Sequence, residues 1–239
     1  FSIPINKLQK TLNEISNSLD NQGKSFSKIH LENINIQNKT LYADLKINPS
    51  DKRNINKVIV KGYDLFPKSF LKNYFKIKPT SVFNKKKLED ISLSSINLQF
   101  IKEIKPPEVL FTKDSTQLFL YLSKKQNNSI DGIVNFTTKE NGDLLFNGML
   151  DIRFHNILNT GERFEVFWNS IGDERQEFKI TTEIPYVFNS IISPKISFSI
   201  FKQDSTFLNT KFNANFKFNV IENYILGFNY ENESSENLE

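Results

Sequence analysis

The sequence predicts an α+β N-terminal half followed by antiparallel strands that cross a lipid bilayer, as an incomplete barrel of about seven strands. The first observation is a change of period, because helical spacing of apolar residues is confined to the part before residue 128. The second is the stretch 208–220, where a fully polar set alternates with a set that is apolar except for Thr210. A soluble sandwich strand usually alternates over ~5–6 residues, whereas a tilted membrane strand needs ~9–11. The length of 208–220 therefore favours a bilayer.

The composition of the 239-residue chain limits its function classes. There is no run of 18 apolar residues that would form a transmembrane helix. Cysteine is absent, which excludes disulfides, thiol catalysis and cysteine metal sites. The net charge is only +4 and no basic stripe is present, so we expect no nucleic-acid partner. The sequence starts at Phe1, and we expect it to be a mature or internal segment of a longer protein.

The first predicted elements are a helix and a hairpin. Apolar spacings of four, three and four predict an amphipathic helix over 7–21. Strands are predicted over 27–36 and 40–47, joined by a turn at 38–39. The apolar residues change parity near Asn33, which predicts a β-bulge or bend there.

A complete second unit follows. A short strand over 57–60 ends at Gly62, and Pro67 is expected as the first residue of a helix. Asn84 is expected to cap a second helix. The hairpin formed by 108–112 and 117–123 completes the order β-α-α-β-β.

This unit and the partial one before it resemble POTRA domains. The resemblance rests on the strand before Gly62-Tyr63, the helix entered at Pro67, the polar turn before the last strand and the tandem repetition. It implies the C-terminal part of a POTRA-like domain over 1–49 and a complete one over 50–127. An unrelated α+β interaction domain is the alternative.

The POTRA resemblance further implies an edge strand that accepts a client segment by β-augmentation. That strand maps to Glu108, Val109, Leu110, Phe111 and Thr112. A proline at Leu110 is expected to remove one donor from this edge.

From residue 128 onward, seven strands are predicted in a single phase. Large apolar residues fall on even positions and charged or amide residues on odd ones. The predicted strands cover 131–138, 144–154, 162–170, 176–186, 194–202, 206–220 and 223–231. The connecting turns form two alternating sets. One set is 156–161, 187–193 and 221–223; the other is 139–143, 171–175 and 203–205, together with an acidic tail at 231–239.

Short motifs in this half resemble Omp85-family barrels, specifically BamA/TamA-type outer-membrane proteins of Bacteroidota. The motif positions are Asn156 and Gly161 in one turn, and Pro185 and Tyr186 after the fourth strand. The resemblance implies that 128–239 is the N-terminal portion of an Omp85-type barrel. The family's later strands and its Arg-containing late loop are not within this sequence.

The Omp85 resemblance also implies a place and a role. The protein would sit in the outer membrane of a Gram-negative bacterium, with its POTRA-like units in the periplasm, and would assemble or insert outer-membrane proteins without nucleotide. Its partners would be outer-membrane lipid and unfolded outer-membrane protein clients, with periplasmic chaperones or accessory lipoproteins as further candidates. The first barrel strand would form a lateral seam. Its residues are Gly132, Ile133, Val134, Asn135, Phe136, Thr137 and Thr138.

No pattern in the sequence predicts catalysis or a cofactor. Only His30 and His155 could serve as imidazole ligands or bases, and both are interpreted as structural or interfacial. No HExxH, G-x-S-x-G or phosphate-binding loop occurs. We therefore expect no enzyme activity, no metal and no cofactor. Two alternatives to an assembly factor stay open: an Omp85-type secretion pore, and a soluble or surface-anchored β-rich binding or adhesion protein.

Overall fold

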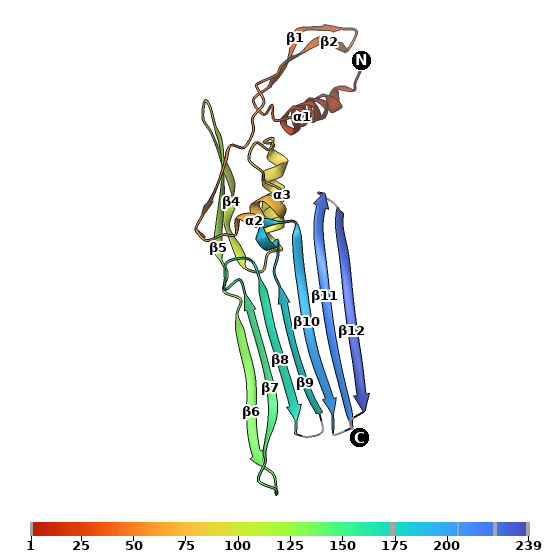
Figure 1. The fold of residues 1–239 in the computed structure, drawn as a ribbon. Coiled ribbons are helices and arrows are strands. Elements are labelled where there is room, and N and C mark those ends of the chain that lie inside the picture. Colours follow the sequence, from red (N-terminus) through yellow and green to blue (C-terminus); the bar gives the residue numbers. More distant parts are fainter. Residues whose placement is uncertain (1, 173–174, 205, 222–223, 238–239) are drawn as a thin grey trace. The chain divides into compact units, whose positions relative to one another are not determined.

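The computed structural model describes residues 2–172, 175–204, 206–221 and 224–237 (Figure 1). Those parts of the predicted turns and acidic tail that fall on 173–174, 205, 222–223 and 238–239 lie outside the described residues. The chain divides into two compact units. Unit 1 comprises Phe1–Gly62, Ile77–Asn97 and Glu103–Ser123; unit 2 comprises Tyr63–Lys76, Leu98–Lys102 and Lys124–Glu239. No helix among the described residues is long and apolar enough to span a membrane.

Unit 1 begins with the predicted helix and hairpin. These are α1 (Ile5–Asn21), β1 (Lys28–Gln37) and β2 (Thr40–Asn48). The β1–β2 register shifts between Glu32 and Asn35, and Asn33 has a φ of 52°, so the predicted bulge is confirmed. Asn38 and Lys39 both have positive φ, as a two-residue hairpin turn with the right twist requires.

The five elements of the second repeat occur in the predicted order. They are β3 (Lys57–Lys61), α2 (Lys68–Asn73), α3 (Lys85–Ile96), β4 (Ile101–Phe111) and β5 (Thr116–Lys124). The sheet order is β3-β5-β4, with β3 parallel to β5. The buried residues of the central strand form its core: Leu118, Leu120 and Leu122. The predicted cap is confirmed, since the Asn84 side chain accepts a hydrogen bond from the Lys87 N–H.

Two local expectations in this repeat were wrong. Pro67 is the N-cap of α2 with ψ of 116°, and not its first helical residue. The strand predicted at 108–112 corresponds to β4, which starts at Ile101 and stops at Phe111. It is therefore longer than predicted and includes Pro106 and Pro107. A strand tolerates such prolines at a sheet edge, where a missing N–H donor is least costly.

Unit 2 contains one open antiparallel sheet of seven strands. In chain order they are β6 (Ser129–Thr138), β7 (Leu144–His155), β8 (Arg163–Ile171), β9 (Arg175–Glu183), β10 (Ile192–Gln203), β11 (Phe207–Ile221) and β12 (Tyr224–Asn237). Every strand pairs with its sequence neighbours, so the sheet order follows the chain (Figure 1). Among the described residues β6 and β12 do not pair with each other.

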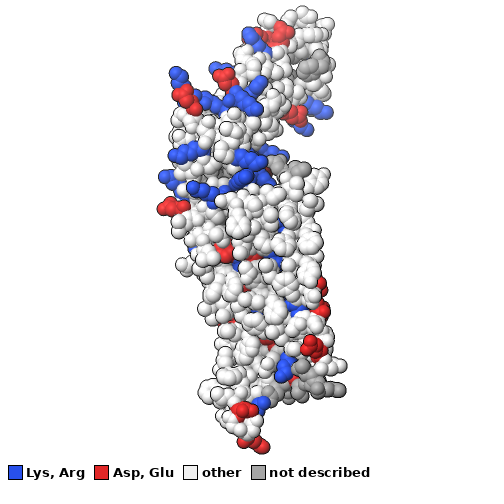
Figure 2. Space-filling view, viewed as in Figure 1, with Lys and Arg blue, Asp and Glu red and all other residues white. Residues whose placement is uncertain are grey.

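The strand registers agree with the prediction that apolar residues occupy even positions and polar residues odd positions in all seven strands. Apart from Ile221–Tyr224, where the register shifts, each pairing in this sheet joins residues of the same parity, so the even and odd sets stay on opposite faces from strand to strand. One row of directly paired even positions contains Ile152, Val166, Ile180, Phe198 and Phe212. The adjacent odd row contains Arg153, Glu165, Thr181, Ser197 and Asn213. We refer to these surfaces as the apolar face and the polar face. In Figure 2 charged side chains are scarce over the visible face of these strands.

Two strand ends differ from the sequence prediction. The fourth strand stops at Glu183 and not at 186, because Pro185 lacks a donor and Tyr186 adopts a left-handed φ of 53°. The segment predicted as an acidic tail is strand as far as Asn237. This segment continues the backbone ladder with β11 as far as the pair Phe207–Asn237, and Lys211 on β11 also forms an ion pair with Glu231 at 2.7 Å.

The two faces predict opposite responses to the same substitution. Phe198→Lys places a charge on the apolar face near the middle of β10, whereas Ser197→Lys places it on the polar face. If the apolar face meets lipid, Phe198→Lys should destabilise the protein folded into vesicles and reduce its free energy of unfolding by about 2–4 kcal/mol. Ser197→Lys should change it little. Urea titration of the folded fraction in vesicles measures both, and equal losses would contradict this orientation.

Candidate functional site: edge strand, polar face and turn cluster

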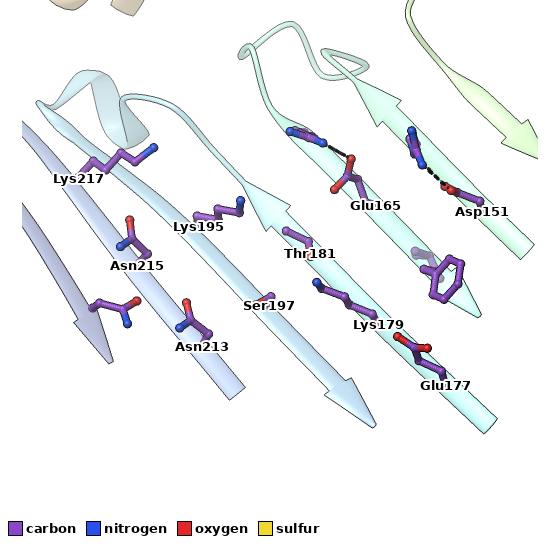
Figure 3. A pocket seen from close by; sticks show the side chains of 15 residues that line it. Asp151, Glu165, Glu177, Lys179, Thr181, Lys195, Ser197, Asn213, Asn215 and Lys217 are labelled. Atoms are coloured by element: carbon purple, nitrogen blue, oxygen red, sulfur yellow. Dashed lines mark hydrogen bonds and ion pairs between the residues drawn. The ribbon is translucent and has the colours of Figure 1, made fainter. Parts of the chain in front are cut away.

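The polar face forms an open groove of about 800 Å³ along β7–β12. Figure 3 shows its side chains rising from neighbouring strands toward the same space. The labelled residues include acids, lysines, asparagines and hydroxyls: Asp151, Glu165, Glu177, Lys179, Thr181, Lys195, Ser197, Asn213, Asn215 and Lys217.

Many charges of this groove are paired along their own strand. Arg153 bonds Asp151 at 2.6 Å, and Arg163 bonds Glu165, each two residues away on the same face. The groove is lined by five basic and three acidic residues, and each acid pairs with an arginine on its own strand. It therefore resembles a hydrated wall with a small excess of positive charge.

The second candidate feature is strand β6, an edge of the sheet. Nine of its ten residues are exposed, and Ile133 and Phe136 each expose 70% of their surface. On its outer side it has no partner strand among the described residues. An edge of this kind presents unpaired backbone donors and acceptors to any strand that approaches it.

The inner ladder of β6 is thinly packed. On the apolar face, Gly132 lies opposite Leu150 and Val134 lies opposite Gly148. A Cβ on Gly148 would lie 1.9 Å from the Ile133 carbonyl oxygen, so the strands approach closely there. Good cross-strand pairs contribute about 0.2–1 kcal/mol each, and two of the pairs in this ladder lack one partner side chain.

The third feature is a cluster of turns at the α2 end of unit 2. Asn156, which is fully buried, donates from its side chain to the Tyr63 hydroxyl at 2.8 Å and accepts from the Gly161 N–H. The Tyr63 hydroxyl in turn donates to Asn159. Gly161 has φ of +76°, and a Cβ there would meet the Phe70 ring at 2.5 Å, so both backbone and space require glycine.

A single carboxylate holds the same turn in shape. Glu162 accepts hydrogen bonds from the Leu158 N–H and from the N–H and hydroxyl of Thr160. Burial raises the pKa of this carboxyl, but these hydrogen bonds together lower it by more than burial raises it. The net pKa therefore lies below its usual value.

Tyr186 connects the next turn to α2. Its ring packs edge-on against Phe70 with centroids 5.1 Å apart, and its hydroxyl accepts from the Asn219 side chain. Burial, with a smaller contribution from the nearby Tyr74, raises the pKa of the Tyr186 phenol to about 12. The Asn73 side chain donates to the Ser190 carbonyl and closes the contact.

The structure brings together only some of the sequence-predicted positions. Asn156, Gly161 and Tyr186 converge on residues 63–76, within unit 2. Pro185, which precedes Tyr186 in the sequence, is half-buried. Gly62 belongs to unit 1, where a Cβ would meet the Leu122 carbonyl at 2.7 Å.

The predicted client-pairing strand lies at a sheet edge, because β4 is outermost in the order β3-β5-β4. In the turn between β4 and β5, the Thr112 N–H donates to the Ser115 carbonyl. Because successive residues of a strand direct their N–H groups to opposite sides, we expect the Leu110 N–H to point toward β5 and the Val109 N–H to point toward the free edge. Thr112 itself lies just beyond β4.

Sequence reasoning missed the partners of the turn motifs. Tyr63, Phe70 and Glu162 complete the cluster, yet no local pattern distinguishes them. Tyr63 is separated from Asn156 by 93 residues, so only the tertiary structure shows the pairing.

The fold is similar to that of two solved structures. One is BamA from Haemophilus ducreyi lacking POTRA domains 1–3, at 15% identity and a TM-score of 0.62, covering 99% of this chain and 46% of that one. Another is CdiB from Acinetobacter baumannii, at 15% identity and a TM-score of 0.58, covering 98% of this chain and 47% of that one. The chain thus spans less than half the length of either. No family model matches it, and neither does any curated protein. The similarity shows that this chain shares the fold of the corresponding part of those structures, here with a seven-stranded antiparallel sheet.

Removing one hydroxyl tests the turn cluster. Tyr63→Phe leaves the ring in place but deprives Asn156, which is buried, of a hydrogen-bond acceptor. An unsatisfied buried group costs about 1–3 kcal/mol. We expect faster amide exchange at 156–161 in the variant, measured by mass spectrometry. Val60→Ala, in unit 1, is the control and should leave that segment unchanged. Unaltered exchange in Tyr63→Phe would show that the hydroxyl contributes nothing.

The lowered pKa of Glu162 predicts an acid-sensitive turn. A carboxyl with a folded pKa below its unfolded value contributes stability above the unfolded pKa, and that contribution is lost as the pH falls through the folded pKa. Amide exchange at 158 and 160, corrected for its intrinsic pH dependence, should therefore rise on acidification below about pH 4.5. In Glu162→Gln it should be high throughout and independent of pH. The same acid response in both proteins would assign it to another group.

Proposed function

We propose that the chain is part of an outer-membrane protein assembly factor of the Omp85 type, which inserts client strands without nucleotide and without a catalytic step. The observation that carries this proposal is β6, an exposed strand whose outer edge is unpaired among the described residues and whose inner ladder is thin.

The proposed chemistry is backbone hydrogen bonding. In a bilayer core no water satisfies free N–H and C=O groups, so an open strand edge there is unfavourable. A client strand that pairs with β6 supplies these partners and is itself satisfied. The long β10–β11 ladder, with twelve paired positions and neither glycine nor a gap, would stay closed while β6 exchanges partners.

The periplasmic assignment of the N-terminal half belongs to the same proposal. Residues 1–49 and 50–127 would be POTRA-like units, supported by the β-α-α-β-β order of the second and by the edge position of β4. The clients would be unfolded outer-membrane proteins, with periplasmic chaperones or accessory lipoproteins as further partners and outer-membrane lipid around the strands.

A secretion pore of the same superfamily is the second candidate. The hydrated polar face with its paired charges favours it, because a polar wall suits a passing hydrophilic chain. An assembly factor should accelerate client folding in vesicles, whereas a pore should release client to the other side. A soluble β-rich binding protein agrees less well with the continuous row of large apolar residues from Ile152 to Phe212.

Crosslinking tests the seam. Because the chain contains no cysteine, single cysteines at Ile133, Asn135 or Thr137 provide unique attachment points. We expect them to crosslink to a stalled client strand. Matched cysteines at Asn213 and Asn215, on an interior strand, should not. Client crosslinks at the β11 positions alone would place the seam elsewhere.

A proline pair tests the edge of β4. Val109→Pro removes an outward donor and should reduce client assembly while leaving the fold intact. Leu110→Pro removes an inward donor and should destabilise the unit, as interior proline does in a ladder. Circular dichroism melting of the two variants, compared with assembly rates in vesicles, separates the effects. If Val109→Pro lost stability and assembly in equal measure, the outer side of β4 would not be a pairing edge.

A further inference from the structure

We infer that the α2 end of unit 2 is an anionic-lipid-binding surface, in which apolar turn tips enter the headgroup layer and neighbouring lysines contact lipid phosphates. The inference rests on the proposal that β6–β12 span a bilayer. It adds a partner and a location that the barrel strands themselves do not specify.

The first observation is that two turns at this end project large apolar side chains. Leu158 is 74% exposed and Phe188 is 100% exposed. Ile157 and Ile191, in the same turns, are also exposed. By contrast, the turn at the opposite end between β6 and β7, residues 139–143, contains no large apolar residue.

These tips are held in fixed backbone shapes. The Leu158 N–H donates to the Glu162 carboxylate, and the Ser190 carbonyl accepts from Asn73 on α2. Phe188 has a φ of 54°, which is uncommon for a residue with a Cβ and persists only when its surroundings hold it. A rigid turn that exposes an apolar tip loses little conformational entropy on entering an apolar phase.

The second observation is the charge beside each tip. Lys124 donates to Asn159, next to Leu158, at 2.7 Å. Lys68 and Lys72 are exposed on α2, which contacts the turn of Phe188 through Asn73. Residues 63–76 and 124–128 carry five lysines and one acid, Asp64. Figure 2 shows Lys and Arg gathered at the α2 end of the sheet.

Apolar tips flanked by lysines suit a membrane interface. Apolar side chains bury into the boundary between headgroups and acyl chains, while nearby lysines gain from anionic headgroups. The tips also continue the apolar face, because Ile184 is exposed just beyond β9 and leads directly to the Phe188 turn. This continuity favours lipid over an acidic protein as the partner.

The experiment places an environment-sensitive fluorophore on single cysteines at Leu158 or Phe188 in the full chain, folded into vesicles. The vesicles are phosphatidylcholine alone or a mixture with phosphatidylglycerol. We expect quenching by lipids brominated near the headgroup and protection from aqueous iodide, both stronger with phosphatidylglycerol. In Lys68→Gln/Lys72→Gln, the ratio of lipid-inserted to water-exposed Phe188 label should fall roughly tenfold in the anionic vesicles. It should be unchanged in phosphatidylcholine alone.

Two control labels separate the inference from the proposed function. A label at Ile152, on the apolar face, should be quenched by deeply brominated lipid, and its failure would overturn the membrane-spanning proposal itself. A label at Asn141, in the polar turn, should be open to iodide. If Ile152 is quenched but Phe188 and Leu158 are as open to iodide as Asn141, the lipid surface is refuted. Insertion that does not depend on phosphatidylglycerol would refute the role of the lysines.

Discussion

This structure depends on one constraint, which is that paired residues in all six strand pairings of the sheet have the same parity, apart from Ile221–Tyr224. Because side chains alternate along a strand, a slip of one residue in any of the six pairings would exchange the faces of all later strands. The even registers prevent this, so Phe198 stays among apolar neighbours and Ser197 among polar ones. A bilayer strengthens the constraint, since a misplaced lysine would lie in hydrocarbon. The two faces, the hydrated groove and the proposed seam all depend on these registers.

The second determinant acts at one end of the sheet only. There Asn156, Gly161 and Tyr186 contact the aromatic segment 63–76 through hydrogen bonds and ring packing. The hydroxyl of Tyr63 and the carboxylate of Glu162 satisfy backbone and amide groups that the turns leave free. The turns are therefore fixed, although loops of this length would otherwise be mobile. The fixed end and the thinly packed β6 ladder are the two features on which the proposed exchange of strand partners at this edge rests.

The two edge strands of the sheet, β6 and β12, differ in how firmly each is held by its one neighbouring strand. β6 has glycine in two of its apolar-face pairs, whereas β12 is longer and is tied to β11 by the pairing of Lys211 with Glu231. An exchange of partners would begin at the edge with the smaller loss. The lipid surface inferred at the α2 end would add an anchor near the fixed turns, so that opening at β6 need not displace the rest of the sheet.

The sequence alone determined the strand faces, the number of strands in this half, the bulge at Asn33 and the cap at Asn84. These features follow from local rules, namely the period-two alternation of strands and the hydrogen bonds that a short polar side chain makes to nearby backbone. The similarity of the fold to the solved BamA and CdiB structures also agrees with the resemblance indicated by short motifs, although that resemblance could not show what the motifs contact.

Only the tertiary structure decided the rest. The partners of Asn156 and Gly161 lie some 90 residues away along the chain, at Tyr63 and Phe70. The end of β9 depended on the left-handed Tyr186, and the extension of β12 depended on its backbone ladder with β11 as far as Phe207. In each case the deciding interaction is non-local or depends on a single dihedral angle, and a linear pattern of residue types contains neither.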